Sequence, residues 1–166
     1  METYSELIKK AKSFYRGYGV AVRKHAEREA VASLTMPDFA YIQSERGDKD
    51  IENNSALATV GDAVLGAYTM LRAFPLDRSM TDDELSDLKV AVLSNDFLNT
   101  MGEKIAPYLN RYNNDFKSVE KGMATAFEAV VGFVALHAPA ALGKFLRRFA
   151  FDAAVDSVVL KFTPLR

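Results

Sequence analysis

The sequence predicts an all-α protein that folds as one globular unit. Apolar residues recur at spacings of three and four through most of the 166 residues, which is the period of an amphipathic helix. The sequence shows no strand-like alternation, internal repeat or low-complexity tract. With 49% hydrophobic and 26% charged residues, it has the composition of an ordinary globular protein rather than a disordered one.

The first helical pattern runs from Ser5 to about Val31, with Ser5 as a candidate N-cap. Gly17 and Gly19 are candidate positions for a bend or an interruption in it. A turn and a brief helix follow around Pro37, and residues 43–53 have the polar composition of a loop.

The strongest helical pattern begins at Asn54 or Ser55 and ends at Pro75. Its glycines, Gly61 and Gly66, each cost a helix about 1 kcal/mol relative to alanine. We therefore expect them to allow close backbone packing. After Pro75, the sequence predicts a helix that begins with a Thr81–Glu84 capping box, and then a helix over 94–109. A polar loop over 110–122 follows. The last two predicted elements are a buried apolar helix over 123–137, which Pro139 ends, and a helix over 140–160.

Several classes of protein are excluded or disfavoured by composition. Cysteine is absent, which excludes a disulfide scaffold, a thiolate metal site and a cysteine nucleophile. Charge or proline interrupts each apolar stretch well before about 18 residues, so no membrane span is expected. Acids occur at once in the N-terminal sequence, so we expect no secretory signal and a cytoplasmic location.

The net charge of −1 is unevenly distributed. Residues 1–30 and 136–166 each carry +3, whereas the residues between them carry −7. A domain that binds nucleic acid is usually basic overall, and this one is not. The acidic middle is either a solvated helical surface or a metal-dependent active site flanked by basic ends that hold a polyanion.

Two acids stand inside apolar helical runs: Asp62 in LATVGDAVLGAY and Glu128 in MATAFEAVVGFVAL. A carboxylate in apolar surroundings is costly unless it is paired or bound to a metal. Each acid could meet a Lys, an Arg or a helix N-terminus. Alternatively, the two could face each other across a divalent cation, and Mg²⁺ suits such a site because it takes one or two carboxylates and keeps several waters.

The stretches around these acids resemble motifs of the ribonuclease III family. NNSALATVGDAVLGAY (53–68) resembles the first family motif, and ATAFEAVVGFVAL (124–136) resembles the second. Between them, DELSDLKVAVLSNDFLNTMGEKI (83–105) is similar to the linking segment, and SLTMPDFAY (33–41) weakly resembles an upstream one. The resemblance covers roughly residues 30–150, which divides the chain into an N-terminal helical extension (1–30) and a ribonuclease III-like domain (31–166).

The chain departs from the family pattern at three acidic positions. Ser55 and Ala58 replace two acids of the first motif, and Thr125 replaces one of the second. The mini ribonuclease III subgroup shows the same reduction and consists of a nuclease domain alone, which is also the expectation here. Asp82 lies near the place of another family acid, although it is equally an ordinary acidic helix start.

The resemblance implies a homodimeric endonuclease that hydrolyses structured or double-stranded RNA, such as ribosomal RNA precursors, with Mg²⁺ or Mn²⁺. Asp62 and Glu128 would be its catalytic and metal-binding residues, and the products would have 5′-phosphate and 3′-hydroxyl ends. A ribosomal protein could present the RNA. The alternative is a catalytically inactive module of the same fold that binds RNA or protein as a scaffold.

The partner contacts have weaker support in the sequence. Candidate RNA-binding residues are Arg111, Lys117 and Lys121, with Lys144, Arg147 and Arg148 further along, and each is otherwise a plain surface cation. Candidate dimer residues are Leu57, Val60, Tyr68, Phe127 and Val131, for which the alternative is ordinary core packing. His25 and His137 are far apart in the sequence and lack metal-ligand spacing, so we interpret them as surface or capping histidines.

Overall fold

The computed structural model describes residues 2–47, 51–111 and 120–162. Within these ranges the regular structure is helical, apart from an isolated bridge between Thr35 and Asn110, and the all-α prediction is confirmed. The elements are α1 (Tyr4–Gly17), η1 (Lys24–Ala26), α2 (Glu27–Ser33), α3 (Pro37–Glu45), α4 (Ser55–Ala73), α5 (Asp82–Val92), α6 (Asn95–Glu103), η2 (Ala106–Tyr108), α7 (Glu120–His137), η4 (Pro139–Ala141), α8 (Leu142–Arg148) and α9 (Phe151–Phe162), where η denotes a 3₁₀ helix.

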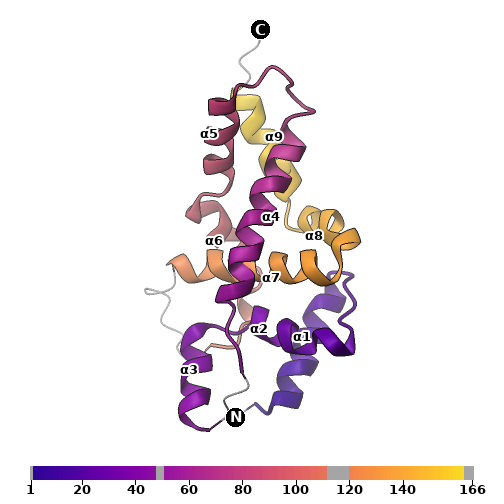
Figure 1. Ribbon diagram of the computed structural model, residues 1–166, viewed down its shortest axis with the longest axis vertical. Coiled ribbons are helices and arrows are strands. Elements are labelled where there is room, and N and C mark those ends of the chain that lie inside the picture. The colour runs from indigo at the N-terminus through magenta and orange to yellow at the C-terminus, as the bar shows by residue number, and fades with distance from the viewer. Residues whose placement is uncertain (1, 48–50, 112–119, 163–166) are drawn as a thin grey trace.

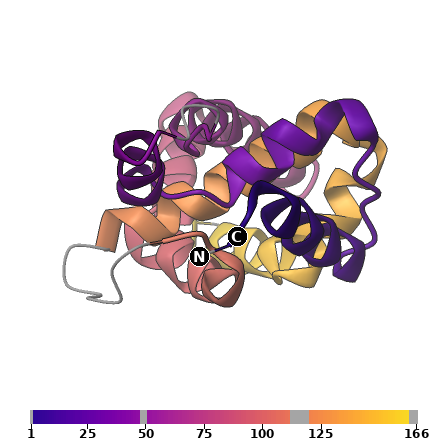
Figure 2. The ribbon, with the colours of Figure 1, turned by 90° about the horizontal axis from the view of Figure 1, so that it is seen from below.

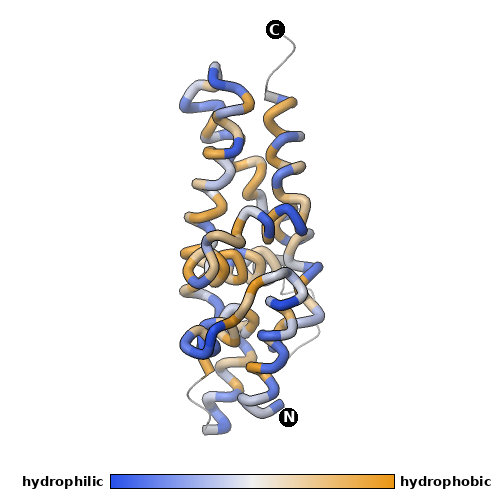
Figure 3. The backbone as a smooth tube through the Cα atoms, turned by 90° about the vertical axis from the view of Figure 1, so that its right-hand side faces the viewer, coloured by the Kyte–Doolittle hydropathy of each residue, from blue (hydrophilic) through white to orange (hydrophobic). Residues whose placement is uncertain are grey.

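Helix α7 lies at the centre of the molecule. Figure 1 shows α4 running along the long axis with α7 crossing it, and Figure 2 shows α2 lying along α7. Phe127, Val130, Phe133 and Val134 of α7 are completely buried, as its nearly all-apolar sequence predicted. Hydrophobic segments gather around this crossing in Figure 3. The core therefore forms around one apolar helix, on which α2, α4, α6 and α8 pack.

The start of α4 is fixed by backbone hydrogen bonds from distant segments. The Met36 amide donates to the Asn110 carbonyl at 2.9 Å, and the Asn110 amide donates to the Leu34 carbonyl at 2.7 Å. The Asn54 amide, just before α4, donates to the Thr35 carbonyl at 2.9 Å. These bonds satisfy buried backbone groups outside the helices and hold the first turn of α4 in place.

Two capping boxes define helix starts. Thr81 and Glu84 cap α5 as predicted: the Thr81 amide donates to Glu84 Oε2 at 2.8 Å, and the Glu84 amide donates to Thr81 Oγ1 at 3.3 Å. The prediction that Ser5 caps the first helix is wrong, because Thr3 forms the same reciprocal pair with Glu6. That helix ends at Gly17, where the sequence suggested an interruption.

The C-terminal segment forms two helices rather than the one predicted over 140–160. Helix α8 ends before Phe149, and α9 begins at Phe151. Between them Ala150 has a φ of 60°, a left-handed conformation that costs alanine about 1–2 kcal/mol. Burial of Phe149 and Phe151 on either side offsets this cost, and Phe149 stacks on Tyr18 at 4.9 Å between ring centroids.

Other boundaries shift by smaller amounts. The helix predicted over 94–109 is divided into α6 and η2, and the loop predicted over 110–122 ends earlier because α7 begins at Glu120. The division of the chain at residue 30 stays a prediction; Phe14 and Tyr15 of α1 belong to the same buried cluster as α7. In the described part of the chain, no helix has the length and apolar character needed to cross a membrane.

Candidate active site

The candidate site lies where α4 crosses α7. A Cβ atom added to Gly61 would lie 1.8 Å from the Glu128 carbonyl oxygen, and one added to Gly132 would lie 2.1 Å from the Leu57 carbonyl oxygen. Side-chain carbons essentially never come within 3.0 Å of another heavy atom in this way, so the two helices touch through their backbones. The expected close packing is confirmed at Gly61, and it requires that residue to lack a side chain.

This backbone contact places the two predicted acids beside each other. Asp62 follows Gly61 in α4, and Gly61 rests on the backbone of Glu128 in α7. Glu128 is half-buried, and burial together with the negative charge of Asp62 raises its pKa to about 7. Asp62 is exposed, which differs from the expectation that both acids lie in apolar surroundings. Leu57 and Leu65 of the same apolar run are buried, whereas Asp62 lies on the exposed face of α4.

Neither acid has a cationic partner among the described residues. No Lys, Arg or His nitrogen of these residues forms an ion pair within 4.0 Å of Asp62 or Glu128. The same residues contain no cluster of three or more His, Asp or Glu side chains that could hold a metal. The donor set is thus two carboxylates, which is enough for Mg²⁺ because that ion binds through one or two carboxylates and retains waters. The pair therefore fits a hard divalent cation.

A groove of about 590 Å³ opens beside Asp62. Its other walls come from α5 and from the start of α6, with some apolar side chains and several polar ones. The lining residues are Asp62, Met70, Ser86, Lys89, Val90, Leu93, Ser94 and Asn95. The sequence analysis did not single out Lys89, Ser86, Ser94 or Asn95, because helix periodicity does not show which surfaces of α4 and α5 face each other. The glycine at position 66, which lies under the Lys89 side chain, is the feature of the sequence that could have indicated a close contact on this face of α4.

The three positions that lack family acids have different surroundings. Ala58 is buried in a small apolar cluster with Ala32, Leu57 and Ala129, so a methyl group stands there in place of the family's carboxylate. Ser55 is exposed in the first turn of α4. Thr125 precedes Glu128 by three residues in α7, which places both on one face of the helix.

The structure describes the side chains of only some of the predicted RNA-binding cations. Lys117 lies outside the described residues, as does the side chain of Lys121, and Arg111 is half-buried next to the Thr35–Asn110 bridge. In α8, Lys144, Arg147 and Arg148 are exposed. Arg148 donates to the Gly17 carbonyl at the end of α1, so the two basic ends of the chain meet there. Arg147 lies 4.0 Å from Asp152.

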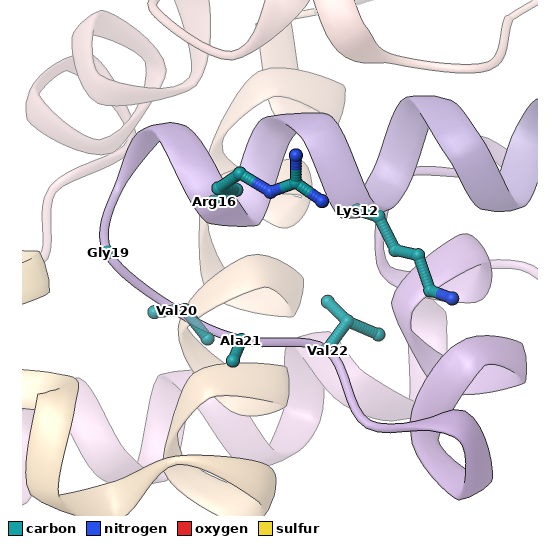
Figure 4. Close-up of a pocket in the computed structure, with 6 residues that line it drawn as sticks. All are labelled: Lys12, Arg16, Gly19, Val20, Ala21 and Val22. Carbon is teal, nitrogen blue, oxygen red and sulfur yellow. The ribbon is translucent and has the colours of Figure 1, made fainter.

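Three other features lie away from Asp62 and Glu128. The histidines are neighbours in space despite their separation in sequence: the rings of His25 and His137 are 6.2 Å apart, and His137 also packs on Phe133. Asp82 is the first residue of α5 and acts there as an acidic helix start. A second pocket, of about 440 Å³, lies between the end of α1 and the following loop (Figure 4). Its walls contain Lys12 and Arg16 but no acid, so it offers no carboxylate ligand.

The comparisons with known proteins agree with this geometry. The family model of the Ribonuclease III domain matches residues 55–139, a range that contains both Asp62 and Glu128. The chain belongs to the ribonuclease III family. Among curated proteins no significant sequence match is found.

A solved ribonuclease III structure shows the same fold. It is the nuclease domain of ribonuclease III from Campylobacter jejuni, which is described as flexible in the region involved in its dimer formation. The match has a TM-score of 0.59 at 17% sequence identity and covers 95% of this chain and 99% of the other. At that identity the likeness supports the fold. The nuclease-domain fold expected from the motifs is therefore confirmed over almost the whole chain.

Proposed function

We propose that this ribonuclease III domain is a divalent-metal-dependent endoribonuclease that hydrolyses phosphodiester bonds in structured or double-stranded RNA. The observation that carries the proposal is the contact between Gly61 and the Glu128 backbone, which brings Asp62 and Glu128 together without a cationic partner among the described residues. Two carboxylates held in this way need a positive charge, and a hard divalent cation supplies one.

The two acids have separate tasks in this proposal. Mg²⁺ or Mn²⁺, when bound, would lower the pKa of a coordinated water and stabilise negative charge on the phosphate oxygens. Asp62 would present its exposed carboxylate to the cation from the groove. Glu128 would be ionised when the cation is bound and would accept a proton near neutral pH when it is absent, because burial and Asp62 raise its pKa to about 7. Its backbone, packed on α4, keeps this carboxylate in position.

The assembly proposed for this activity is a homodimer, so that two sites cut the two strands of a duplex. Phe127 and Val131, two of the candidate dimer residues, are completely buried in the chain's own core and cannot contact a second copy, whereas Leu57 is 8% exposed. Sedimentation of the purified chain tests the dimer directly. Ribosomal RNA precursors as substrate, a ribosomal protein that presents them and a cytoplasmic location remain part of the proposal.

A second candidate function is a catalytically inactive scaffold that binds RNA or protein. The buried methyl group of Ala58 favours it, because the site lacks a carboxylate there and the described residues contribute only two acids to it. The two candidates differ in one measurable property, which is cleavage of RNA.

Cleavage of a hairpin RNA in Mg²⁺ tests the proposal. We expect Asp62→Asn and Glu128→Gln to lose at least about 100-fold in rate, a loss of roughly 2.7 kcal/mol in transition-state stabilisation. Glu103→Gln is the matched control, since Glu103 is an exposed glutamate on α6 that does not line the groove. Calorimetric titration with Mn²⁺ should show binding to the wild-type chain and to the control only. A wild-type chain that binds RNA but never cuts it would favour the scaffold.

A further inference from the structure

Lys89, a cation that lines the candidate groove, has no ion-pair partner among the described residues. Lys89 of α5 reaches across to α4, and a Cβ atom added to Gly66 would lie 2.8 Å from its Cε and 3.3 Å from its Nζ. The aliphatic part of the lysine therefore lies directly on the bare backbone of α4. Lys89 is half-buried, although a free lysine would normally extend into solvent.

The position over Gly66 brings the ammonium group to the acidic side of the groove. Asp62 and Gly66 are four residues apart in α4, so they lie on the same face. Helical Cα–Cβ bonds tilt toward the N-terminus, so the space that a side chain at Gly66 would occupy lies over the turn that contains Asp62. Lys89 fills that space, and both Asp62 and Lys89 line the groove.

The other features of the groove also fit an anion rather than an intramolecular ion pair. In the described part of the chain no carboxylate oxygen lies within 4.0 Å of the Lys89 ammonium, whereas Lys10 and Lys12 of α1 pair with Glu2 and Glu27. Ser94, at the N-cap of α6 on the same groove, makes no side-chain capping hydrogen bond. The groove thus holds the Lys89 ammonium group and the Ser94 hydroxyl group on the side opposite α4, the helix that carries Asp62.

We infer that Lys89 contacts the substrate of the proposed nuclease by binding a non-bridging phosphate oxygen of the RNA backbone next to Asp62. The inference rests on the proposed function and adds a residue to it. A lysine suits this task because its compact charge attracts a phosphate from several directions. Gly66 is the positioning residue, since only a residue without a side chain lets the lysine lie across α4.

The test separates RNA binding from cleavage. A short blunt RNA duplex is titrated in EDTA, over a series of KCl concentrations, with the full chain carrying Asp62→Asn and Glu128→Gln. In this background Lys89→Met should make the negative slope of log affinity against log salt shallower by about one, because one phosphate contact is lost. Lys89→Arg should restore the slope. Lys161→Met is the control, since Lys161 is an exposed lysine of α9 that does not line the groove.

Gly66→Ala provides a second variant that keeps the lysine. Its new methyl group meets only the far part of the flexible Lys89 side chain, so the chain should fold and the ammonium group should be displaced. We expect the same loss of slope in this variant, with an unchanged circular dichroism spectrum. An unchanged slope in both Lys89→Met and Gly66→Ala overturns the assignment of Lys89 and leaves the nuclease proposal intact. If the slope becomes shallower in these variants but the wild-type chain never cuts RNA, the assignment of Lys89 as an RNA contact is supported and the nuclease proposal is overturned. A wild-type chain that does not bind the duplex at low salt overturns both.

Discussion

The two halves of α4 are held in the molecule by different means. The first half touches α7 through backbone atoms, at Gly61 against Glu128 and at Leu57 against Gly132. The second half is held to α9 by polar side chains: the Tyr68 hydroxyl donates to Asp152 at 2.7 Å, and Arg72 makes two hydrogen bonds to Asp156. Backbone contacts cannot adjust by changing a rotamer, whereas side-chain contacts can.

This difference explains where the acids lie. Asp62 lies on the half of α4 that touches α7 through backbone atoms, so the proposed site would keep a fixed separation between the backbones of its two acids. The second half carries two exposed apolar side chains, Met70 and Leu71, and Phe74 is exposed just after the helix. Its contacts with α9 include the partly exposed Arg72–Asp156 ion pair. Exposed ion pairs contribute about 0–1 kcal/mol, so this part tolerates more change.

The largest effect is expected from a side chain at the crossing. Gly61→Ala places a methyl group 1.8 Å from the Glu128 carbonyl oxygen, and α4 must move away from α7. We expect a loss of at least about 3 kcal/mol in unfolding free energy, the upper end for overpacked cores, measured by urea denaturation. Gly17→Ala is the control, because nothing lies within 4 Å of a Cβ at that position, and its effect should stay within about 1 kcal/mol. Equal stability of the two variants would contradict the backbone contact.

A smaller effect is expected at the second half of α4. Tyr68→Phe removes the hydroxyl that donates to the nearly buried Asp152, and we expect a loss of about 1.5 kcal/mol in urea denaturation. Burial and the hydrogen bond to Asp152 raise the pKa of Tyr68 to about 12, so the hydroxyl remains a donor at neutral pH. Tyr41→Phe on α3 is the control, because Tyr41 is 67% exposed, and it should change stability by less than about 0.5 kcal/mol. A cost as large as that of Gly61→Ala would remove the distinction between the two halves.

The smallest effect is a pH dependence at the crossing. The fold raises the pKa of Glu128 from 4.5 to about 7, so between these pH values the folded chain holds a proton that the unfolded chain has lost. In EDTA, the wild-type stability relative to Glu128→Gln should therefore fall as the pH rises from about 4.5 through about 7. Partial exposure of Glu128 keeps the change modest. Denaturation curves of the two proteins at pH 4.5, 6 and 8 provide the measurement, and a difference independent of pH would show that the carboxyl group is not perturbed.

Local features of the fold were predictable from the sequence. The Thr81–Glu84 box depends on hydrogen bonds between neighbours in the chain, and the start of α4 after Asn54 follows from where its helical pattern begins. Close backbone packing at Gly61 was predictable, because packing must compensate for the stability that a glycine costs inside a helix. The order of the motifs around Asp62 and Glu128 also indicates the family.

Features that depend on distant residues were not predictable in this way. Ala150 adopts a left-handed conformation without the glycine that usually marks a helix end, because burial of its aromatic neighbours determines the break. His25 and His137 meet only because α7 ends next to η1. Likewise, helix periodicity identified a face on α5 but could not show that Lys89 lies across Gly66. The motifs identify Asp62 and Glu128 as candidate site residues, but the exposure of Asp62 depends on how α4 packs and could not be predicted from the sequence.

The central place of α7 has a consequence for the newly synthesised chain. The ribosome releases α1 through α6 before α7 emerges, yet α2, α4 and α6 all pack on α7. Until Glu128 and Gly132 leave the exit tunnel, the backbone of Gly61 has nothing to rest on and the apolar side of α4 faces water. Vectorial folding of this protein must therefore wait for its last third, and a nascent chain that stalls before α7 is a substrate for chaperones.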